Sequence, residues 1–191
     1  MNSSINFPKI FLITGNPGVG KTTLIQGLYQ KLSQDKTKTI KGFYTEEIRE
    51  NGQRSGFDVV NLENKERAPL ARIFHQMSRY RVGKYGVEIE NFEQMTLPIF
   101  KDISQRCICI IDEIGKMEAT SKNFERLMLN LLDKVSTENF LIIATVPTSY
   151  LSLSDKFKQH PKSKIFEVTF LNRNNLADQI FDNITEAYNK L

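Results

Sequence analysis

The stretch from Gly15 to Thr22 constrains this chain more than any other part of its sequence. It reads Gly-Asn-Pro-Gly-Val-Gly-Lys-Thr and matches the pattern G-x-x-x-x-G-K-[ST] in full. Glycines at these spacings let the backbone aim successive N–H groups inward, and the start of a helix adds about half a positive charge. A segment of this kind cradles phosphate groups when it links a buried strand to a helix.

The flanking sequence supplies that context. Lys9 to Thr14 contains four successive large apolar residues, which is typical of a strand buried on both faces. Apolar residues then recur at helical spacing from Leu24 to Leu32. In such a unit Lys21 reaches the β- and γ-phosphate oxygens and the Thr22 hydroxyl binds Mg²⁺. The residues predicted to contact the phosphates are Gly15, Asn16, Pro17, Gly18, Val19, Gly20, Lys21, Thr22 and Thr23.

A second chemical landmark is the acidic pair Asp112-Glu113, which follows the apolar run from Cys107 to Ile111. An aspartate at the end of a buried strand is suited to hold the Mg²⁺ that bridges the phosphates, so Thr22 and Asp112 are the predicted metal ligands. A carboxylate beside it, Glu113, can orient and deprotonate an attacking water. Taken alone, two acidic residues after a strand would be read as solvated loop residues; the phosphate-binding motif favours the catalytic interpretation.

The remaining pattern predicts a single α/β domain of three layers over residues 1–191, with a mostly parallel sheet between helices. Asn51-Gly52 is the strongest short-range signal for a type I′ turn and predicts an antiparallel hairpin over Gly42 to Leu62. Residues 63–86 show no sustained periodicity and are predicted to be irregular. Further elements are expected as helices over residues 92–104, 124–135 and 176–188 and as strands over residues 140–145 and 165–169.

Charge is unevenly distributed. The net charge of +4 is too small to indicate nucleic-acid binding by itself. Six basic residues, however, lie between Lys65 and Lys84 with only Glu66 opposing them. They could close over a triphosphate as a lid, or they could be ordinary solvated surface charge. The six are Lys65, Arg67, Arg72, Arg79, Arg81 and Lys84.

Weaker signals concern isolated residues. Thr145 ends a predicted strand and is a candidate catalytic residue near the γ-phosphate, or simply a β-branched structural residue. Arg173 precedes the last predicted helix and is a candidate nucleotide contact. His75 and His160 have no paired carboxylate in the sequence. Cys107 and Cys109 lie two apart in an apolar run, which favours two core thiols on one face over a disulfide or a zinc site.

The start of the chain, Met1 to Pro8, has no basic segment followed by an apolar one, and no apolar run approaches the roughly 18 residues that a membrane span needs. We therefore expect a soluble protein of the cytoplasm or another intracellular compartment. A monomer is expected rather than an oligomer.

The chain resembles the small P-loop proteins called cancer-related nucleoside-triphosphatases. The resemblance runs nearly end to end and is most specific in GFYTEE, from Gly42 to Glu47, and in RVGKYG, from Arg81 to Gly86. It implies a P-loop NTPase fold and Mg²⁺-dependent hydrolysis of several nucleoside triphosphates, with little base selectivity. It also implies that Cys107 to Lys116 belongs to the nucleotide site. The residues so implied are Cys107, Ile108, Cys109, Ile110, Ile111, Asp112, Glu113 and Ile114. The stretch between the hairpin and Arg81 is shorter and more basic than this resemblance leads us to expect.

Two other classes of function remain open on the sequence. One is a kinase that passes the γ-phosphate to a nucleoside, nucleotide or polynucleotide end; Glu113 argues against it, because a kinase does not need to activate water. The other is a nucleotide-gated module that binds RNA through the basic segment. Nucleic acid is a possible partner but not an expected one.

Overall fold

The computed structural model describes residues 7–73, 78–101, 103 and 106–191. Their strands form one mixed sheet in the order β5-β6-β4-β3-β2-β7-β8-β1-β9. The strands are β1 (Ile10–Thr14), β2 (Thr39–Glu50), β3 (Gln53–Asn61), β4 (Arg67–Ile73), β5 (Arg81–Val82), β6 (Tyr85–Val87), β7 (Cys107–Ile111), β8 (Phe140–Thr145) and β9 (Ser163–Glu167). The helices are α1 (Lys21–Leu32), α2 (Ile89–Thr96), α3 (Lys122–Lys134), α4 (Ser152–Gln159) and α5 (Arg173–Asn189), and short 3₁₀ turns lie at Pro98–Phe100 and Glu118–Thr120.

The strands that carry the two chemical landmarks run parallel to one another. β7 lies between β2 and β8, and β1 lies between β8 and β9, all in parallel pairing. In this register Ile13 of β1 is level with Thr145 of β8, and Ile111 of β7 is level with Ala144. The carboxyl ends of these strands therefore meet at one edge of the sheet, which is where ligands bind in open α/β sheets. The predicted α/β fold class is confirmed.

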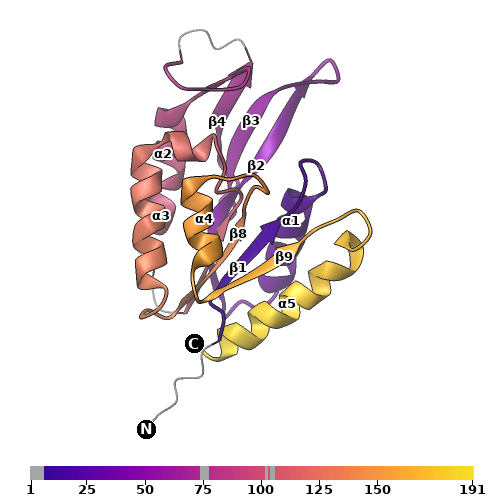
Figure 1. Cartoon of the computed structure of the whole chain (residues 1–191), viewed down its shortest axis with the longest axis vertical. Helices are drawn as coiled ribbons and strands as arrows, with labels where there is room; N and C mark the ends of the chain where they lie inside the picture. Colours follow the sequence, from indigo (N-terminus) through magenta and orange to yellow (C-terminus); the bar gives the residue numbers. More distant parts are fainter. Residues whose placement is uncertain (1–6, 74–77, 102, 104–105) are drawn as a thin grey trace.

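The other end of the sheet is antiparallel. β2 and β3 form the predicted hairpin, and Asn51 and Gly52 at its turn both have positive φ, at 50° and 77°. Because the first half of β2 also pairs in parallel with β7, the hairpin is continuous with the main sheet. It projects beyond the carboxyl edge of the parallel strands (Figure 1).

The prediction that residues 63–86 are irregular is wrong. β4 pairs with β3, β6 pairs with β4, and β5 pairs with β6, all antiparallel. Pro69 argued against a strand at β4, because proline is rare within a sheet. It lies opposite Asp58, where the pairing of β3 and β4 shifts by a residue, and such irregularities are where sheets tolerate proline.

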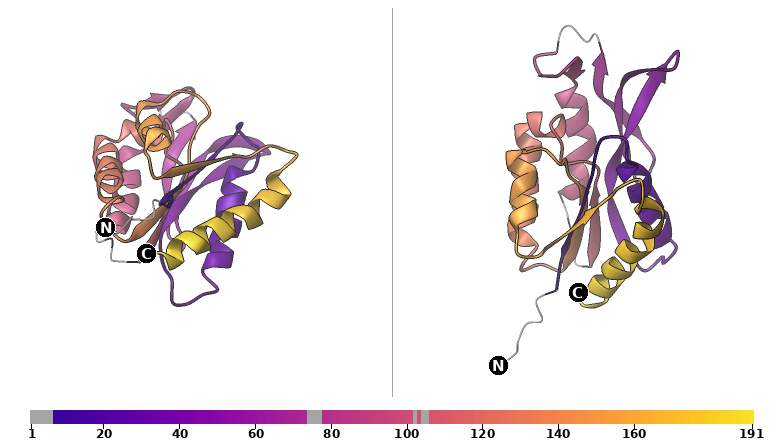
Figure 2. Two further views of the ribbon diagram at one scale, coloured as in Figure 1. Left: turned by 60° about the horizontal axis from the view of Figure 1, so that its bottom comes forward. Right: turned by 45° about the vertical axis from the view of Figure 1, so that its right-hand side comes forward.

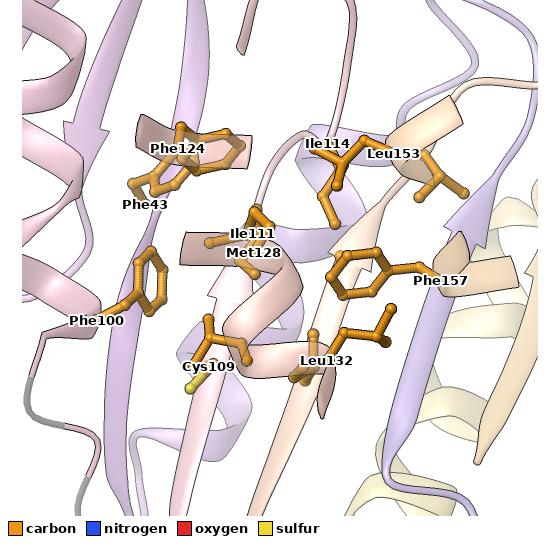
Figure 3. Packing of buried hydrophobic residues seen from close by; sticks show 14 of the residues in the cluster. Phe43, Phe100, Cys109, Ile111, Ile114, Phe124, Met128, Leu132, Leu153 and Phe157 are labelled. Atoms are coloured by element: carbon orange, nitrogen blue, oxygen red, sulfur yellow. The ribbon is translucent and has the colours of Figure 1, made fainter. Parts of the chain in front are cut away.

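Helices cover both faces of the sheet (Figure 2). α1 and α5 pack on one face and α2, α3 and α4 on the other, each over its own cluster of buried side chains. On the second face Phe43 of β2 meets Phe92 of α2 and Phe124 of α3, with ring centroids 5.8 and 6.0 Å away. Figure 3 shows Phe43 and Phe124 beside residues of β7 and α3 in this core. These contacts hold α2 and α3 against the strands whose carboxyl ends form the edge that carries the Gly15–Thr22 loop and the Asp112-Glu113 pair.

Two helix predictions differ from the structure. The helix expected over residues 92–104 is α2, which begins at Ile89 and ends at Thr96, because Pro98 lacks the N–H that would continue it. α4 was not expected at all. It is only eight residues long, and it packs Leu153 and Phe157 into the core while its other residues are polar. No helix in the described part of the chain is both long and apolar enough to span a membrane.

Candidate active site

The glycine-rich loop after β1 has the geometry that its sequence predicts. Gly15, Gly18 and Gly20 all have positive φ, at 148°, 76° and 107°. A β-carbon on Gly15 would lie 3.3 Å from the carbonyl carbon of Val168 and closer still to its oxygen, so the loop passes the end of β9 without room for a side chain. α1 begins at Lys21, and the amides of its first turn have no partner inside the helix. The Lys21 ammonium lies over the loop and donates to the Gly15 carbonyl oxygen at 2.9 Å.

Asp112 is buried at the edge between this loop and β8. Its side chain is 1% exposed and accepts hydrogen bonds from the Thr22 hydroxyl at 2.8 Å and from the Thr145 hydroxyl at 2.5 Å. The backbone N–H of Thr45 on β2 is a more distant third donor, at 3.4 Å. Burial raises the pKa of Asp112, and the hydrogen bonds from the threonines act against this by favouring the carboxylate. The two acid oxygens are thus already oriented, one toward α1 and the other toward β8.

Thr22 and Asp112 fit the predicted Mg²⁺ as far as their chemistry goes. Hydroxyl and carboxylate oxygens are the ligands that Mg²⁺ prefers, and the two groups are in direct contact here. No set of three or more His, Cys, Asp or Glu residues within the described ranges is arranged as a metal cage. Mg²⁺ usually keeps several of its waters and is held by one or two protein oxygens together with substrate phosphates, so these two groups would be enough to hold it.

Glu113 lies next to a second acid, Glu118, which the sequence interpretation missed. A β-carbon on Gly115 would lie 2.7 Å from Glu118 Oε2 and closer still to Glu113 Oε1, so both carboxyl groups crowd the same glycine. Glu118 is only 3% exposed. Burial raises its pKa well above the usual range, and the nearby Glu113 carboxylate raises it further. The pKa of Glu113 is also raised, first by burial and then by Asp112.

The segment that carries the two glutamates is held in place by its backbone. The Ile114 N–H donates to the Thr145 carbonyl oxygen at 2.9 Å, which ties the segment to β8. The Ala119 N–H donates to the Gly115 oxygen at 3.0 Å. At the next turn Ser121 caps α3 by accepting from the Phe124 N–H, and its hydroxyl donates to Glu93 of α2 at 2.5 Å. Glu113 therefore sits on a braced turn between β7 and α3.

The strand before Asp112 is wholly buried. Cys107, Cys109 and Ile111 face the core under α2, α3 and α4, whereas Ile108 and Ile110 face the core under α1 and α5. Ile114 is buried as well. The two cysteines are free thiols on one face, in line with the expectation from their spacing. The side chains of this strand thus fill the protein interior, and only its carboxyl end opens onto the site.

Arg173 lies beside the glycine-rich loop after β1, at the first residue of α5. Its Cδ lies 4.0 Å from where a β-carbon on Gly20 would be. Its guanidinium stands over the ring of Phe170, 5.3 Å from the centroid. The structure therefore brings together the loop of Gly15 to Thr23, the acid pair after β7, Thr145 and Arg173.

The basic segment does not form one group. Arg67 and Arg72 pair with Asp58 on the neighbouring strand, and Arg67 also pairs with Glu46. Arg81 lies on β5, the last strand of the sheet, with six strands between it and β1. Together with Arg49, Arg54 and Lys84 it lines a cavity of about 540 Å³ at the hairpin tip. His75 lies outside the described residues.

Two residues at the site had weak signals in the sequence. Thr45 lies inside the hairpin, and only the parallel pairing of β2 with β7 brings its N–H to Asp112. Glu118 follows Asp112 by six residues without any helical or strand periodicity to indicate that it turns back. The one sequence feature that could have indicated a buried acid is that Glu118 follows a short stretch beginning with the apolar residue Ile114.

Comparison with known proteins agrees with this geometry. The sequence model of a family described as NTPase matches residues 10–181. The mouse cancer-related nucleoside-triphosphatase homolog is 39% identical over 180 residues, covering 88% of this chain and 92% of the mouse protein. The solution structure of a human cancer-related nucleoside triphosphatase has a TM-score of 0.79 at 37% identity, over 93% of this chain and 98% of that one. The crystal structure of THEP1 from Aquifex aeolicus has a TM-score of 0.75 at 32% identity, over 90% and 96%.

Proposed function

The chain belongs to the NTPase family, and from this membership and the geometry of its phosphate-binding edge we propose that it hydrolyses nucleoside triphosphates to the diphosphate and phosphate. ATP, GTP, CTP and UTP are all proposed substrates, with Mg²⁺ as the cofactor. The relatives named above carry the name nucleoside-triphosphatase, which supports the general reaction.

The observation that carries the proposal is the placement of Glu113 directly beside Asp112, at the end of a strand that faces the phosphate-binding loop. Hydrolysis needs a base for water, whereas transfer to a hydroxyl acceptor does not need one at this position. Burial and the neighbouring Asp112 both raise the pKa of Glu113, which makes its carboxylate a stronger base than a solvated one. This edge is therefore suited to activate water for attack on a γ-phosphate.

Each neighbouring residue has a distinct part in the proposed reaction. The amides of the loop from Gly15 to Thr23 bind the phosphates, and the Lys21 ammonium leaves its carbonyl partner to neutralise charge on the β- and γ-oxygens. Thr22 and Asp112 would hold Mg²⁺, which would supply neutralisation of the phosphate charge. Glu113 takes the proton of the attacking water.

Thr145 was predicted to act near the γ-phosphate, and we propose that it acts through Asp112. Its hydroxyl is buried and donates to Asp112 Oδ1 at 2.5 Å, so it fixes the orientation of that carboxylate. The buried residues of β7 take a similar part: Cys107 to Ile111 hold Asp112 in place, and direct contact with nucleotide is left to the carboxyl end of the strand. Glu118, packed against Glu113, limits the directions in which the base can point.

The substitution Glu113→Gln tests the mechanism. It removes the base but keeps the size and polarity of the side chain, so we expect turnover to fall by about 10²- to 10⁴-fold while Mg·ATP binding is retained. Phosphate release measures turnover, and isothermal titration calorimetry measures binding. Glu186→Gln, an exposed acid on α5, is the matched control and should behave like the unmodified protein. Full activity in Glu113→Gln removes the proposed role of this residue.

A kinase is the alternative that the same loop allows. A panel of nucleosides, nucleotides and 5′-hydroxyl oligonucleotides, added with radiolabelled ATP, separates the two. If the protein is a hydrolase, the label of the γ-phosphate appears as free phosphate, and adding an acceptor does not change the rate of its release. Label transferred to one acceptor at a rate above that of phosphate release would replace hydrolysis by the kinase reaction.

A further inference from the structure

The turn between β9 and α5 exposes apolar side chains next to the phosphate-binding loop. Phe170 is 67% exposed and Leu171 is 97% exposed, and the other exposed large apolar side chains of the described residues, Tyr80, Tyr150 and Ile165, are not consecutive in the sequence. Single exposed apolar residues are ordinary, but two in succession at the edge of a binding site indicate a contact surface for a ligand. This turn is therefore a candidate for contact with a part of the ligand other than its phosphates.

The turn is rigid, so the exposure of Phe170 is not that of a loose loop. Asn172 accepts from the Thr169 N–H at 2.8 Å through its side-chain oxygen, and its side-chain nitrogen donates to the Glu167 carbonyl oxygen at 2.9 Å. The Arg173 N–H donates to the Thr169 carbonyl oxygen at 3.1 Å. These bonds fix the backbone on both sides of Phe170 before any ligand arrives.

The turn is also fixed against the phosphate-binding loop. The Val168 N–H donates to the Thr14 carbonyl oxygen at 2.8 Å, and Val168 stands against Gly15 with no room for a β-carbon between them. On the other side the Arg173 side chain reaches Gly20. Figure 1 shows the loop after β1 and the start of α5 next to each other at this edge, and the second view in Figure 2 agrees.

The Arg173 guanidinium carbon lies 5.3 Å from the centroid of the Phe170 ring, and both residues are exposed. Aromatic rings and guanidinium planes are the groups on which nucleic-acid bases stack. Stacking is tolerant of sequence because every base has a π-face, and it does not use the hydrogen-bonding edge that distinguishes one base from another.

We propose that Phe170, supported by Arg173, is the stacking platform for the base of the bound nucleoside triphosphate. The proposal rests on the proposed function and extends it to base recognition. It accounts for broad base specificity by contact with the face of the base, with the purines stacking better than the pyrimidines because of their larger area.

The test compares Phe170→Ala with Tyr80→Ala, which removes an exposed aromatic ring from the far, antiparallel end of the sheet. The ligands are ATP, GTP, CTP, UTP and inorganic tripolyphosphate, all with Mg²⁺. Binding is measured by isothermal titration calorimetry and hydrolysis by phosphate release. For Phe170→Ala we expect Kd and KM to rise about tenfold, more for ATP and GTP than for CTP and UTP, with kcat little changed, because stacking binds the ground state and the transition state alike.

Tripolyphosphate distinguishes a base contact from a general effect, because it has no base to stack. Its Kd should be the same for Phe170→Ala, Tyr80→Ala and the unmodified protein. Unchanged nucleotide affinity in Phe170→Ala would overturn the proposal, and so would an equal loss for nucleotides and tripolyphosphate. Neither of these two binding results would contradict the proposed hydrolysis. If the unmodified protein binds the nucleotides but releases no phosphate, the proposed function fails, and the binding comparison still decides the platform.

Discussion

Replacing Glu118 by glutamine removes a buried titratable group while keeping its shape. The carboxyl group of Glu118 is 3% exposed and shares the space over Gly115 with Glu113. Burial is the main cause of its raised pKa, and repulsion from the Glu113 carboxylate is the second. Two buried carboxylates this close cannot both be charged at low cost, so the folded protein keeps a proton that the unfolded chain releases.

The pH dependence of the free energy of unfolding follows from the number of protons that each state binds. Between the ordinary glutamate pKa of about 4.5 and the raised pKa of the folded state, the folded protein binds more protons than the unfolded chain. The free energy of unfolding therefore falls as pH rises through this window, by at most about 1.4 kcal/mol per pH unit for one proton. Glu118→Gln has no such proton. The variant should thus match the unmodified protein near pH 4.5 and become the more stable of the two as pH rises.

Urea unfolding of both proteins from pH 4.5 to pH 8, followed by circular dichroism in nucleotide-free buffer, measures this difference. Subtracting one curve from the other cancels the carboxyl groups that do not interact with Glu118. Glu113 does interact with it, so its titration is part of the measured difference. The reasoning fails if the two stability curves run parallel over the whole range, or if the unmodified protein gains stability relative to the variant as pH rises. Glu118→Gln should also keep most of its turnover, because it leaves Glu113, the proposed base, in place.

The other predictions concern buried contacts. Thr145→Val keeps the shape of the side chain but leaves Asp112 Oδ1 without its donor, so the Mg²⁺ concentration needed for half-maximal hydrolysis should rise several-fold; an unchanged Mg²⁺ titration would exclude the positioning role. Gly42→Ala should lower the free energy of unfolding by about 3 kcal/mol, since φ is 155° and a β-carbon would lie 2.8 Å from the Ile110 carbonyl carbon. Gly27→Ala in α1 meets nothing within 4 Å and should raise stability by about 1 kcal/mol; urea unfolding checks both, and equal signs would contradict this account.

Much of the phosphate-binding edge could be predicted from the sequence because its information is local. The glycines from Gly15 to Gly20, the start of α1 at Lys21 and the turn at Asn51-Gly52 depend on backbone conformations that few other residues adopt. β7 could be predicted from its apolar run, and the position of Asp112 follows from the end of that strand. The acidic pair by itself favoured hydrolysis over transfer, and the family resemblance added the expectation of several nucleotide substrates, which local pattern does not contain.

Other parts of the fold could not be predicted because they depend on pairing between distant segments. The strands between Arg67 and Val87 are short, and what stabilises them is the neighbouring strand and the ion pairs of Asp58. The basic residues of this segment could be counted from the sequence, but the acidic residues with which they pair could not be predicted from it.

The sequence by itself determined the glycine-rich loop at which we propose that phosphate binds, because a loop of fixed backbone geometry needs only its own residues. The tertiary structure alone decided which groups surround Asp112 and Glu113. Thr45, Thr145 and Glu118 come from three different segments, and they meet only when β2, β7 and β8 pair and the turn after β7 folds back over Gly115. Hydrogen bonds and burial at this edge are properties of that packing, and they set the charge state of both acids.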